Sequence, residues 1–540
     1  MTQFNAQHSL AELGSFFSRA ASPSAVKAPQ WLAFNSELAE QLQLPSDVLA
    51  NDAGLAIWSG NAVAEWAHPI AHAYAGHQFG SLVPQLGDGR AMLLAEAVDS
   101  AGKHWDIQLK GAGRTEFSRG GDGRSAIGPV IREYLLSEAM YALGVPTTRA
   151  LAAVASGELV YREQGGVPGG IFTRVASSHL RVGSFQFASL HGGSEKVRQL
   201  ADYAIARHFS GINSPELNTN SLEPDTNSPE LNTNSLEPDT NSPEPNTATP
   251  EGTDKTASSQ RYCAFLTAVA ERQAALINHW LRVGFIHGVM NTDNTSICGE
   301  TIDYGPAAFL DTYHSHKKFS AIDRQGRYAF SQQAAIGQWN LARLAECFLP
   351  LLQPKEQAVA LATQVLANYS QHSEALWLAT MAAKLGIEQP EAEDDNLIQD
   401  FLVLLQQHEI DYTHAFWQLA NELDGSSASS GPKAATATLF AEPNEYLQWR
   451  QRYLQRLAAN SRPIAATIAR MQEVNPALIP RNHRIIEAIT AVEERGSLER
   501  FYQLLNAWQT PYKMPSTELE LELYEAPAAN EQVQRTFCGT

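Results

Sequence analysis

Residues 287–311 read HGVMNTDNTSICGETIDYGPAAFLD, and the fold of the chain is inferred from this segment outward. The segment opens with His-Gly and places Asn291, Asp293 and Asn294 within four residues. A short run with the character of a β-strand follows, and the segment then reaches Asp303-Tyr304-Gly305. Carboxylate and amide oxygens suit Mg²⁺, and a carboxylate can also take a proton from a hydroxyl group. The segment is therefore the first candidate for a catalytic site.

Two parts of this segment resemble catalytic motifs of protein kinases. Kinases use H-R-D-x-x-x-x-N and then D-F-G, where the first Asp accepts the hydroxyl proton and the Asn and second Asp hold magnesium. Aligned on His287, the pattern places Asn294 and Asp303 at the two metal positions. The base position falls on Val289, which cannot accept a proton, and the nearest carboxylate is Asp293. The alternative is a turn followed by a hairpin end, because short motifs carry a high false-positive risk.

Two upstream segments supply possible partners. Gln85-Leu-Gly-Asp-Gly-Arg90 is a glycine-rich turn before the apolar strand Ala91–Ala95, and such a turn can bring backbone N–H groups and an arginine to phosphate. The alternative is a β-hairpin turn, since Asp-Gly is a strong hairpin signal. Trp105–Leu109 alternates like a strand and ends at Lys110, where kinases place a lysine on nucleotide phosphates. The alternative is an exposed lysine at a strand end.

A loop and a helix follow. Arg119–Pro129 holds two arginines and four glycines, and it is either a flexible loop that grips an anion or a solvated loop. Asp122 within it could bond a ribose or a base. Pro129–Leu143 is predicted to be a helix, because proline suits a first turn and apolar residues recur at helical spacing. Glu133 lies off the apolar stripe, where a kinase helix presents its Glu to the strand lysine, although it could also be a solvated charge.

The next segments bring two more arginines and the remaining elements. Thr148–Glu163 and Gly170–Ala176 are predicted strands. Arg174 and Arg181 lie seven residues apart and suit either phosphate recognition or ion pairs. Beyond the 287–311 segment the chain is expected to be largely helical. The predicted helices are Ala334–Leu352, Lys355–Ser370, Ser373–Leu385, Asn396–Leu423 and Asn444–Ala469, the last broken near Pro463.

Composition limits the class of protein. The chain has 540 residues, 44% hydrophobic and 18% charged, which suffices for a large buried core. The net charge of −19 argues against non-specific binding of nucleic acid. Four cysteines give no disulfide framework and no metal-ligand spacing. The first residues lack a basic, apolar leader, and no apolar run reaches 18 residues, so a cytoplasmic protein without a membrane partner is expected.

A tandem repeat interrupts the chain. NSPELNTNSLEPDT occurs twice in Asn213–Thr240, and a decayed third copy follows. The repeat is rich in Pro, Asn, Ser and acidic residues, and 213–254 holds nine acidic residues and no Lys or Arg. Such a composition cannot bury a core. Residues 213–258 are therefore predicted to be a disordered insertion between two helices.

Several long segments together resemble the selenoprotein O (SelO) family. They are GHQFGSLVPQLGDGRA, DIQLKGAGRTEFSRGGDGRSAIGPVIREYL, HGVMNTDN, TIDYGP, NPALIPRNH and the C-terminal FCGT. The resemblance implies an α+β, protein-kinase-like bilobal fold with a small β-rich N-lobe, a larger helical C-lobe and extensions at both ends. The implied divisions are an extension 1–70, an N-lobe 71–190, a C-lobe 191–424 interrupted by 213–258, a linker 425–438 and a helical region with a Cys-containing tail, 439–540.

The resemblance also implies an activity. Members of the family look like pseudokinases but move AMP from ATP to Ser, Thr or Tyr hydroxyls of proteins, with Mg²⁺ or Mn²⁺. ATP lies reversed relative to a kinase, so the α-phosphate is attacked. The expected partners are ATP and protein substrates, with no nucleic acid. Three alternatives stay open: a true kinase that moves the γ-phosphate, UMP transfer from UTP with manganese, and a non-catalytic nucleotide-binding scaffold.

The family's functional positions carry over residue by residue. By resemblance, Asp293 is the base, Asn294 and Asp303 hold the metal, and Glu133 pairs with Lys110. The positions that match ATP-binding residues are Gly87, Gly89, Arg90, Lys110, Asp122, Gly123, Arg174, Arg181 and Asp303.

One departure from the family concerns cysteine. In the family, a C-terminal Cys or Sec can pair with a Cys just after the D-F-G-like motif. Here Pro306–Asp323 contains no Cys, so Cys538 lacks that partner, and Cys298 precedes the motif. No internal disulfide is expected.

Overall fold

The computed structural model describes residues 4–536 except 46–47, 164, 214–249, 426–427, 429 and 442. Most of the repeats (214–249) and Cys538 fall outside these residues, as does part of the 425–438 linker. The predicted disordered insertion 213–258 is wrong at its C-terminal end, because residues 250–258 belong to the helix Pro250–Val283. The described cysteines, 263, 298 and 347, are free. None of the helices in the described part combines the length and apolar character needed to cross a bilayer.

Strands dominate the N-terminal part of the chain. In the described residues, nine strands form one sheet, with β2-β4-β7-β8-β11-β10-β3 as its main order and β1 and β9 paired to β7 and β11. All of its pairings are antiparallel. The strands are β1 Ala6–Gln7, β2 Ser18–Ala20, β3 Gln30–Phe34, β4 Ile70–His72, β7 Ala91–Val98, β8 His104–Lys110, β9 Ser125–Ala126, β10 Arg149–Arg162 and β11 Gly165–Ala176.

The centre of this sheet matches the sequence prediction. The strands predicted around residues 91–95, 105–109, 148–163 and 170–176 are confirmed as β7, β8, β10 and β11. Lys110 lies opposite Ala91 on one side and Phe172 on the other, so its strand is central. Residues before 70 also contribute, because β2 and β3 form the two ends of the main strand order. Short strands of the predicted N-terminal extension 1–70, β1, β2 and β3, thus belong to the sheet.

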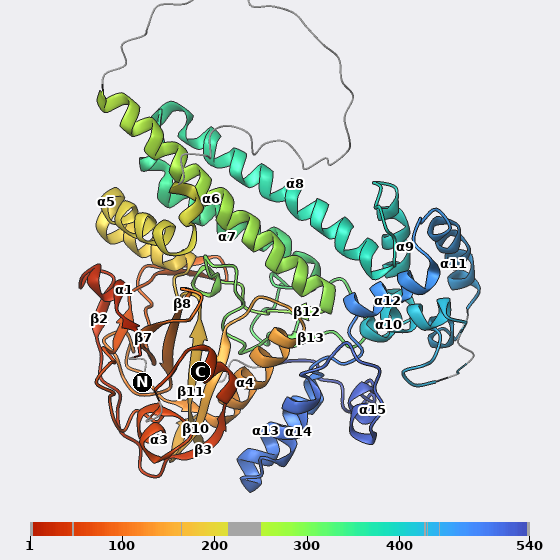
Figure 1. The fold of residues 1–540 in the computed structure, drawn as a ribbon, viewed down its shortest axis with the longest axis horizontal. Coiled ribbons are helices and arrows are strands. Elements are labelled where there is room, and N and C mark those ends of the chain that lie inside the picture. Colours follow the sequence, from red (N-terminus) through yellow and green to blue (C-terminus); the bar gives the residue numbers. More distant parts are fainter. Residues whose placement is uncertain are drawn as a thin grey trace, which may run out of the picture.

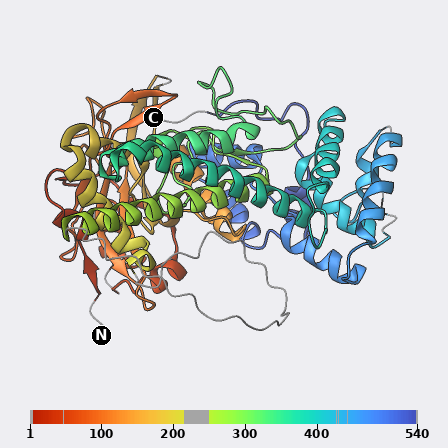
Figure 2. The same cartoon turned by 90° about the horizontal axis from the view of Figure 1, so that it is seen from above.

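Helices form the rest of the molecule. Figure 1 shows the β-rich part on the left, the long helices α6, α7 and α8 beside it, and α9–α12 at the opposite end, and Figure 2 shows the same order from above. The mixed α and β class is therefore confirmed, with a β-rich N-terminal and a helical C-terminal region. The helices are α1 Ser9–Glu12, α2 Ser36–Gln41, α3 Asp52–Trp58, α4 Ile127–Ala142, α5 Val182–His208, α6 Pro250–Val283, α7 Gln333–Phe348, α8 Ala358–Lys384, α9 Asp394–Gln407, α10 Tyr412–Leu423, α11 Asn444–Leu457, α12 Ile464–Val474, α13 Asn482–Arg495, α14 Glu499–Ala507 and α15 Glu518–Tyr524.

Helix α4 is buried between the sheet and the C-terminal helices. Ile131 and Leu135 pack into the core, as the apolar stripe predicts. On its other side α4 meets α13 and α14, and the rings of Tyr134 and Phe501 lie 5.5 Å apart. Burial on two sides explains why the charged side chains of Arg132 and Glu133 are also buried.

Two predictions of where a helix is interrupted are wrong. Residues 355–370 and 373–385 belong largely to one continuous helix, α8, because Ser370–Ser373 contains neither glycine nor proline and Ser370 Oγ bonds back to Leu366 O. The predicted helix 396–423 is instead two helices, α9 and α10. Glu409 between them has φ 53°, and the Asp411 side chain caps α10 by accepting from His414 N. The predicted break near Pro463 is confirmed.

The end of the 287–311 segment is tied to the C-terminal region. Arg481 is 1% exposed, and its Nη1 lies 2.7 Å from Asp311 and 2.9 Å from Asp411. Further along, Thr536 pairs with Ser320 and donates to Pro306 O. The chain's last described residues therefore lie against the segment that follows Asp303-Tyr-Gly.

Candidate active site

The 287–311 segment is closed at its base by two short strands, β12 Phe285–Ile286 and β13 Ala308–Phe309. Phe285 pairs with Phe309, so the two ends of the segment lie side by side. Inside the loop, His287 Nε2 lies 2.9 Å from Ile302 O. Asp303 has φ 73°, a backbone region that is uncommon outside Gly, Asn and Asp. The loop thus holds the 292–294 turn and Asp303 in fixed positions.

Lys110 at the end of β8 joins two acidic residues. Its Nζ lies 2.6 Å from Glu133 Oε2 and 2.5 Å from Asp303 Oδ1. Arg174 on β11 places Nη1 3.1 Å from Glu133 Oε1 and 4.0 Å from Asp303 Oδ1. Lys110 and Glu133 are 9% and 5% exposed, so the alternatives of an exposed lysine and a solvated glutamate are wrong. Four charges from distant parts of the chain therefore meet at one place.

This cluster keeps Asp303 ionised. Burial disfavours the charged carboxylate, but Lys110 and then Arg174 outweigh it and hold the pKa of Asp303 well below its usual range. The Asp303 side chain is 36% exposed, so a ligand can reach it. A negative charge that is accessible and surrounded by cations suits a place between a metal ion and nucleotide phosphates.

Asp293 has a different environment from Asp303. It is 7% exposed, and burial raises the pKa of Asp293 to about 6 while Arg181 opposes the rise. Among the described atoms, its buried Oδ1 has no hydrogen-bond partner. A buried carboxylate with a raised pKa and a free oxygen is suited to accept a proton near neutral pH.

A short hairpin, to which no role was assigned from the sequence, covers part of the 287–311 segment, the catalytic loop. It consists of β5 Gly76–Gln78 and β6 Ser81–Val83. His77 N donates to Thr292 Oγ1 at 2.6 Å, and Phe79 N donates to Asn291 Oδ1 at 3.0 Å. Between these bonds, Gln78 Nε2 lies 3.4 Å from Asp293 Oδ2. The hairpin therefore fixes both the loop backbone and one oxygen of Asp293.

Arg181 lies on the other side of Asp293. Its Nη1 donates to Asp293 O at 2.9 Å, and its guanidinium lies over the Tyr74 ring, 4.4 Å from the centroid. Arg181 is 4% exposed, and its buried Nη2 has no partner in the described part of the chain. A buried donor without a partner is costly, so an anion at Nη2 would complete its bonding.

Two glycine-rich loops approach this region closely. Gly87 has φ 74°, and a Cβ there would lie 2.3 Å from the Phe117 ring. Ser118 Oγ donates to Gly89 O, which fixes the loop that ends at Arg90. Strand β6 pairs with β5 and not with β7, so the alternative of a simple hairpin turn at 85–90 is wrong. Gly123 has φ 70°, and a Cβ there would lie 2.2 Å from the backbone of Gly113.

Asp122 lies at the periphery of this group. It forms an ion pair with Arg162 at 2.8 Å, and its side chain is 46% exposed. It lines a cavity of about 370 Å³ together with Gly111, the residue that follows Lys110. Burial alone would raise the pKa of Asp122. The hydrogen bonds from Arg162 and from Arg124 N outweigh this effect and lower the pKa. The structure thus places Asp122 near the end of β8 and apart from Asp293.

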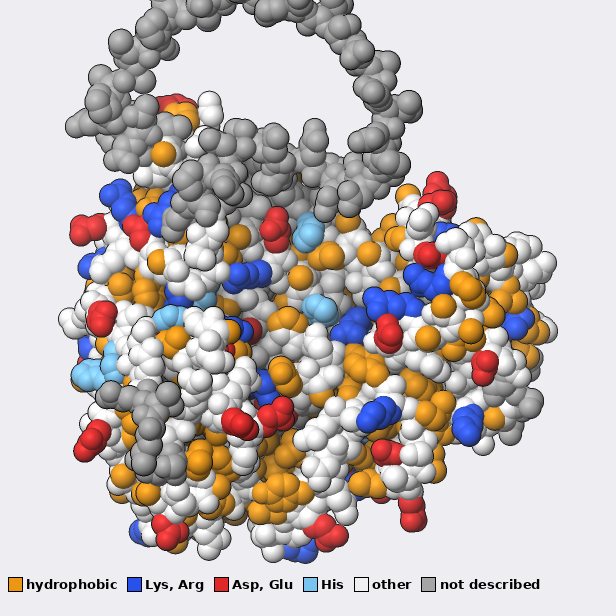
Figure 3. All heavy atoms as spheres, in the orientation of Figure 1, with side chains coloured by type: hydrophobic (Ala, Val, Ile, Leu, Met, Phe, Trp, Pro, Cys, Tyr) orange, Lys and Arg blue, Asp and Glu red, His pale blue; other side chains and the backbone are white. Residues whose placement is uncertain are grey.

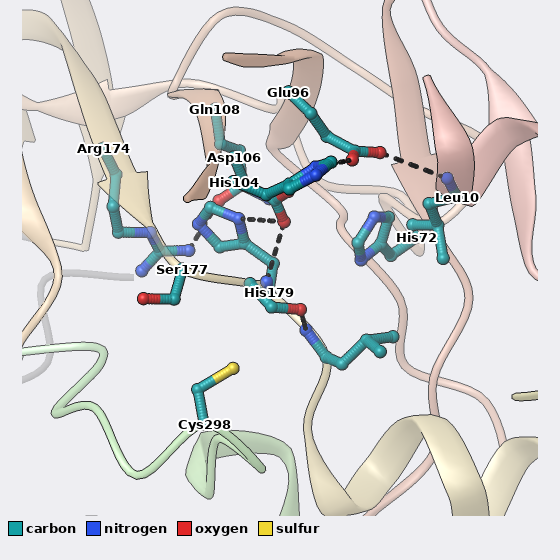
Figure 4. Close-up of polar contacts among 12 residues, drawn as sticks. Leu10, His72, Glu96, His104, Asp106, Gln108, Arg174, Ser177, His179 and Cys298 are labelled. Carbon is teal, nitrogen blue, oxygen red and sulfur yellow. Dashed lines mark hydrogen bonds and ion pairs between the residues drawn. The ribbon is translucent and has the colours of Figure 1, made fainter. Parts of the chain in front are cut away.

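A buried polar row contacts both arginines, and Figure 4 shows Arg174, Gln108, Asp106 and His179 of this row. Arg174 Nη2 donates to Gln108 Oε1 at 2.7 Å. The His179 backbone N–H and ring Nδ1 lie 2.8 and 3.1 Å from Asp106 Oδ2. His179 O in turn accepts from Arg181 Nε at 3.2 Å. Strand β8 therefore orients both arginines as well as Lys110.

Asn294 and Asp303 offer oxygen ligands for a magnesium ion. Asn294 uses its amide nitrogen to bond Val289 O at 3.0 Å, which leaves the amide oxygen for a ligand. Asp303 Oδ2 has no donor among the described residues. No group of three or more His, Cys, Asp or Glu side chains is placed for a metal in that part of the chain. Two oxygen ligands from the protein are enough for an Mg²⁺ ion whose other ligands are phosphate oxygens and water.

Comparisons with known proteins identify the family of the chain. Residues 1–509 match the family model described as Protein adenylyltransferase SelO. The chain is 48% identical to the "Protein nucleotidyltransferase YdiU" of Agrobacterium fabrum over 536 residues, 99% of both chains. It is 46% identical over 542 residues to the protein of the same name in Rhizobium meliloti, with both chains fully covered. The chain therefore belongs to the SelO family of protein adenylyltransferases.

Proposed function

We propose that this protein transfers AMP from ATP to Ser, Thr or Tyr hydroxyls of protein substrates and releases pyrophosphate. The observation that carries the proposal is the position of Asp293, buried with a raised pKa and a free Oδ1, beside a buried Arg181 with a free Nη2. The kinase base position is Val289, so the proton acceptor has moved. We also infer a kinase-like bilobal arrangement, with ATP between the sheet and the helical part.

The proposed ATP site uses the residues that converge on Lys110. Arg90, Lys110, Arg174 and Arg181 would neutralise phosphate charge, while Gly87 and Gly89 let the loop backbone come close. Asp122 and Gly123 would meet the far end of the nucleotide. Asn294 and Asp303 would hold Mg²⁺ or Mn²⁺. When bound, the metal ion supplies positive charge to the phosphates and to the leaving pyrophosphate.

The chain's own residues perform the proton and charge steps. The substrate oxygen attacks the α-phosphorus as the bond from that phosphorus to the bridging oxygen breaks, and pyrophosphate leaves with the electron pair. The hydroxyl proton passes to Asp293 Oδ1, which is free to accept it. A positioned base of this kind contributes about 10²–10⁴-fold. Arg181 stays fixed through its bonds to Asp293 O and His179 O.

ATP labelled separately at the α and γ positions tests the proposal. The full chain is incubated with each label, with Mg²⁺ or Mn²⁺, and its intact mass is measured. Addition of an AMP mass that carries α-label, absent in Asp303→Ala, is the expected result. Label from γ would indicate a kinase, and preferred use of labelled UTP with Mn²⁺ would indicate UMP transfer. ATP binding without any label on the chain or on added acceptor proteins would favour the scaffold.

A further inference from the structure

We propose that a basic groove beside Asp293 binds an acidic segment of the protein substrate; this rests on the proposed AMP transfer to proteins. The groove has a volume of about 670 Å³. It lies between the β5–β6 hairpin and residues 316–336. Its walls include Phe79, His316, Lys318, Arg327, Gln332 and Ile336.

The groove begins next to the proposed base. Phe79 forms one wall, and it directly follows Gln78, whose amide meets Asp293 Oδ2. Behind the groove, the buried Tyr328, which follows the lining residue Arg327, donates its OH to Asn291 Oδ1 at 2.6 Å, the same oxygen that accepts from Phe79 N. The rings of Phe79 and Tyr328 lie 5.2 Å apart. A substrate whose hydroxyl reaches Asp293 would therefore lay its flanking residues along this groove.

The charge of this region is opposite to that of the whole chain. Residues 314–327 read HSHKKFSAIDRQGR, with four Lys or Arg residues and one acid, while the net charge of the chain is −19. The one acid, Asp323, is 3% exposed and accepts the backbone N–H groups of Arg327 and Tyr328. No Asp or Glu is among the described residues that line the groove. Figure 3 shows one face of the whole molecule, where Lys, Arg and His side chains lie among Asp and Glu side chains.

Arg327 is the side chain best placed to recognise a carboxylate. Its guanidinium lies over the Trp339 ring, 4.6 Å from the centroid, and beside Gly80. No carboxylate lies within ion-pair distance of Arg327 in the described part of the chain. Lys318 differs, because its Nζ bonds the carbonyls of Asp323 and Arg324 and so holds the loop. A guanidinium that is already oriented and lacks an acidic partner suits a carboxylate from another chain.

Peptide binding tests this proposal without relying on catalysis. Three fluorescent peptides carry one Tyr flanked by acidic, neutral or basic residues, and their anisotropy is measured with the full chain. The acidic peptide is expected to bind at least fivefold more tightly than the neutral one, in line with roughly 1 kcal/mol for a well-oriented ion pair. Arg327→Glu should remove this preference and improve binding of the basic peptide, whereas Lys355→Glu, an exposed lysine outside the groove, should change neither.

Specific outcomes would overturn the proposal. Equal binding of the three peptides would do so, as would an Arg327→Glu variant that keeps the preference for acid. Displacement of the acidic peptide by pyrophosphate at the concentrations that fill the ATP site would assign the groove to phosphate instead. Retained ATP binding by Arg327→Glu shows that the variant is folded. If acidic peptides bind but no α-label is ever transferred, the groove stands and the proposed function fails.

Discussion

Gln78 Nε2 lies 3.4 Å from Asp293 Oδ2 and joins the β5–β6 hairpin to the catalytic loop. The contact occupies one carboxylate oxygen and leaves the buried Oδ1 without a hydrogen-bond partner among the described atoms. An amide donor favours the charged form of a carboxylate, so Gln78 lowers the pKa of Asp293 while burial and Asp303 raise it. The hairpin therefore both orients the proposed base and keeps its pKa near neutrality.

Gln78→Ala should weaken transfer without weakening ATP binding. A long hydrogen bond to a charged group contributes roughly 1 kcal/mol, so kcat should fall about fivefold. The pKa of Asp293 should rise, because a group that stabilises its charged form is lost. The measurement is the pH profile of kcat/KM alongside the KM for ATP, with Gln364→Ala on the exposed face of α8 as control. If the fall of kcat/KM at acidic pH stays at the same pH in Gln78→Ala, Gln78 does not act on the pKa of Asp293.

Transfer should depend on pH through Asp293. The pKa of Asp293 is about 6, so the carboxylate is ionised above that pH and protonated below it. Because only the ionised form accepts a proton, kcat/KM should fall about tenfold for each pH unit below 6. α-Labelled ATP and a fixed acceptor protein measure this between pH 5 and pH 8. Asp293→Asn should bind ATP and transfer about 10²–10⁴-fold more slowly, and a flat profile down to pH 5 would exclude this carboxylate as the base.

Glu133→Gln should destabilise the fold as well as the site. Glu133 bonds both Lys110 and Arg174 in a buried position. Removing its charge leaves two cations sharing Asp303, and breaking such a buried group costs about 3–5 kcal/mol. Urea unfolding measures the loss. Glu138→Gln on the same helix, which breaks an ion pair with Arg149 at the start of β10, serves as comparison. A loss confined to activity would mean that Glu133 acts on the nucleotide alone.

The sequence predicts best those strands and helices whose hydrophobic pattern and flanking glycine or proline residues point to the same element. The apolar run after a glycine-rich turn predicts β7, the alternation of Trp105–Leu109 predicts β8, and proline with an apolar stripe at helical spacing predicts α4. The break between α9 and α10 was missed although Asp411 is a typical helix cap. The contact of Gln78 with Asp293 could not be predicted, because spacing along the chain says nothing of residues 215 positions apart. GHQFG lies in a segment that carries the family resemblance, but no residue of it was assigned a role.

Gly76→Ala should displace the base by steric pressure alone. A Cβ at Gly76 would lie 2.5 Å from Asp293 Oδ1 and 2.9 Å from Asp293 Cβ, so the carboxylate must move. A misplacement of ~1 Å can cost about 10²-fold in rate, and kcat should fall on that order while the KM for ATP stays unchanged. Gly211→Ala, whose Cβ would have no neighbour within 4 Å among the described atoms, is the matched control. Full activity in Gly76→Ala would mean that Oδ1 can leave its position without loss, which a proton acceptor at that atom does not allow.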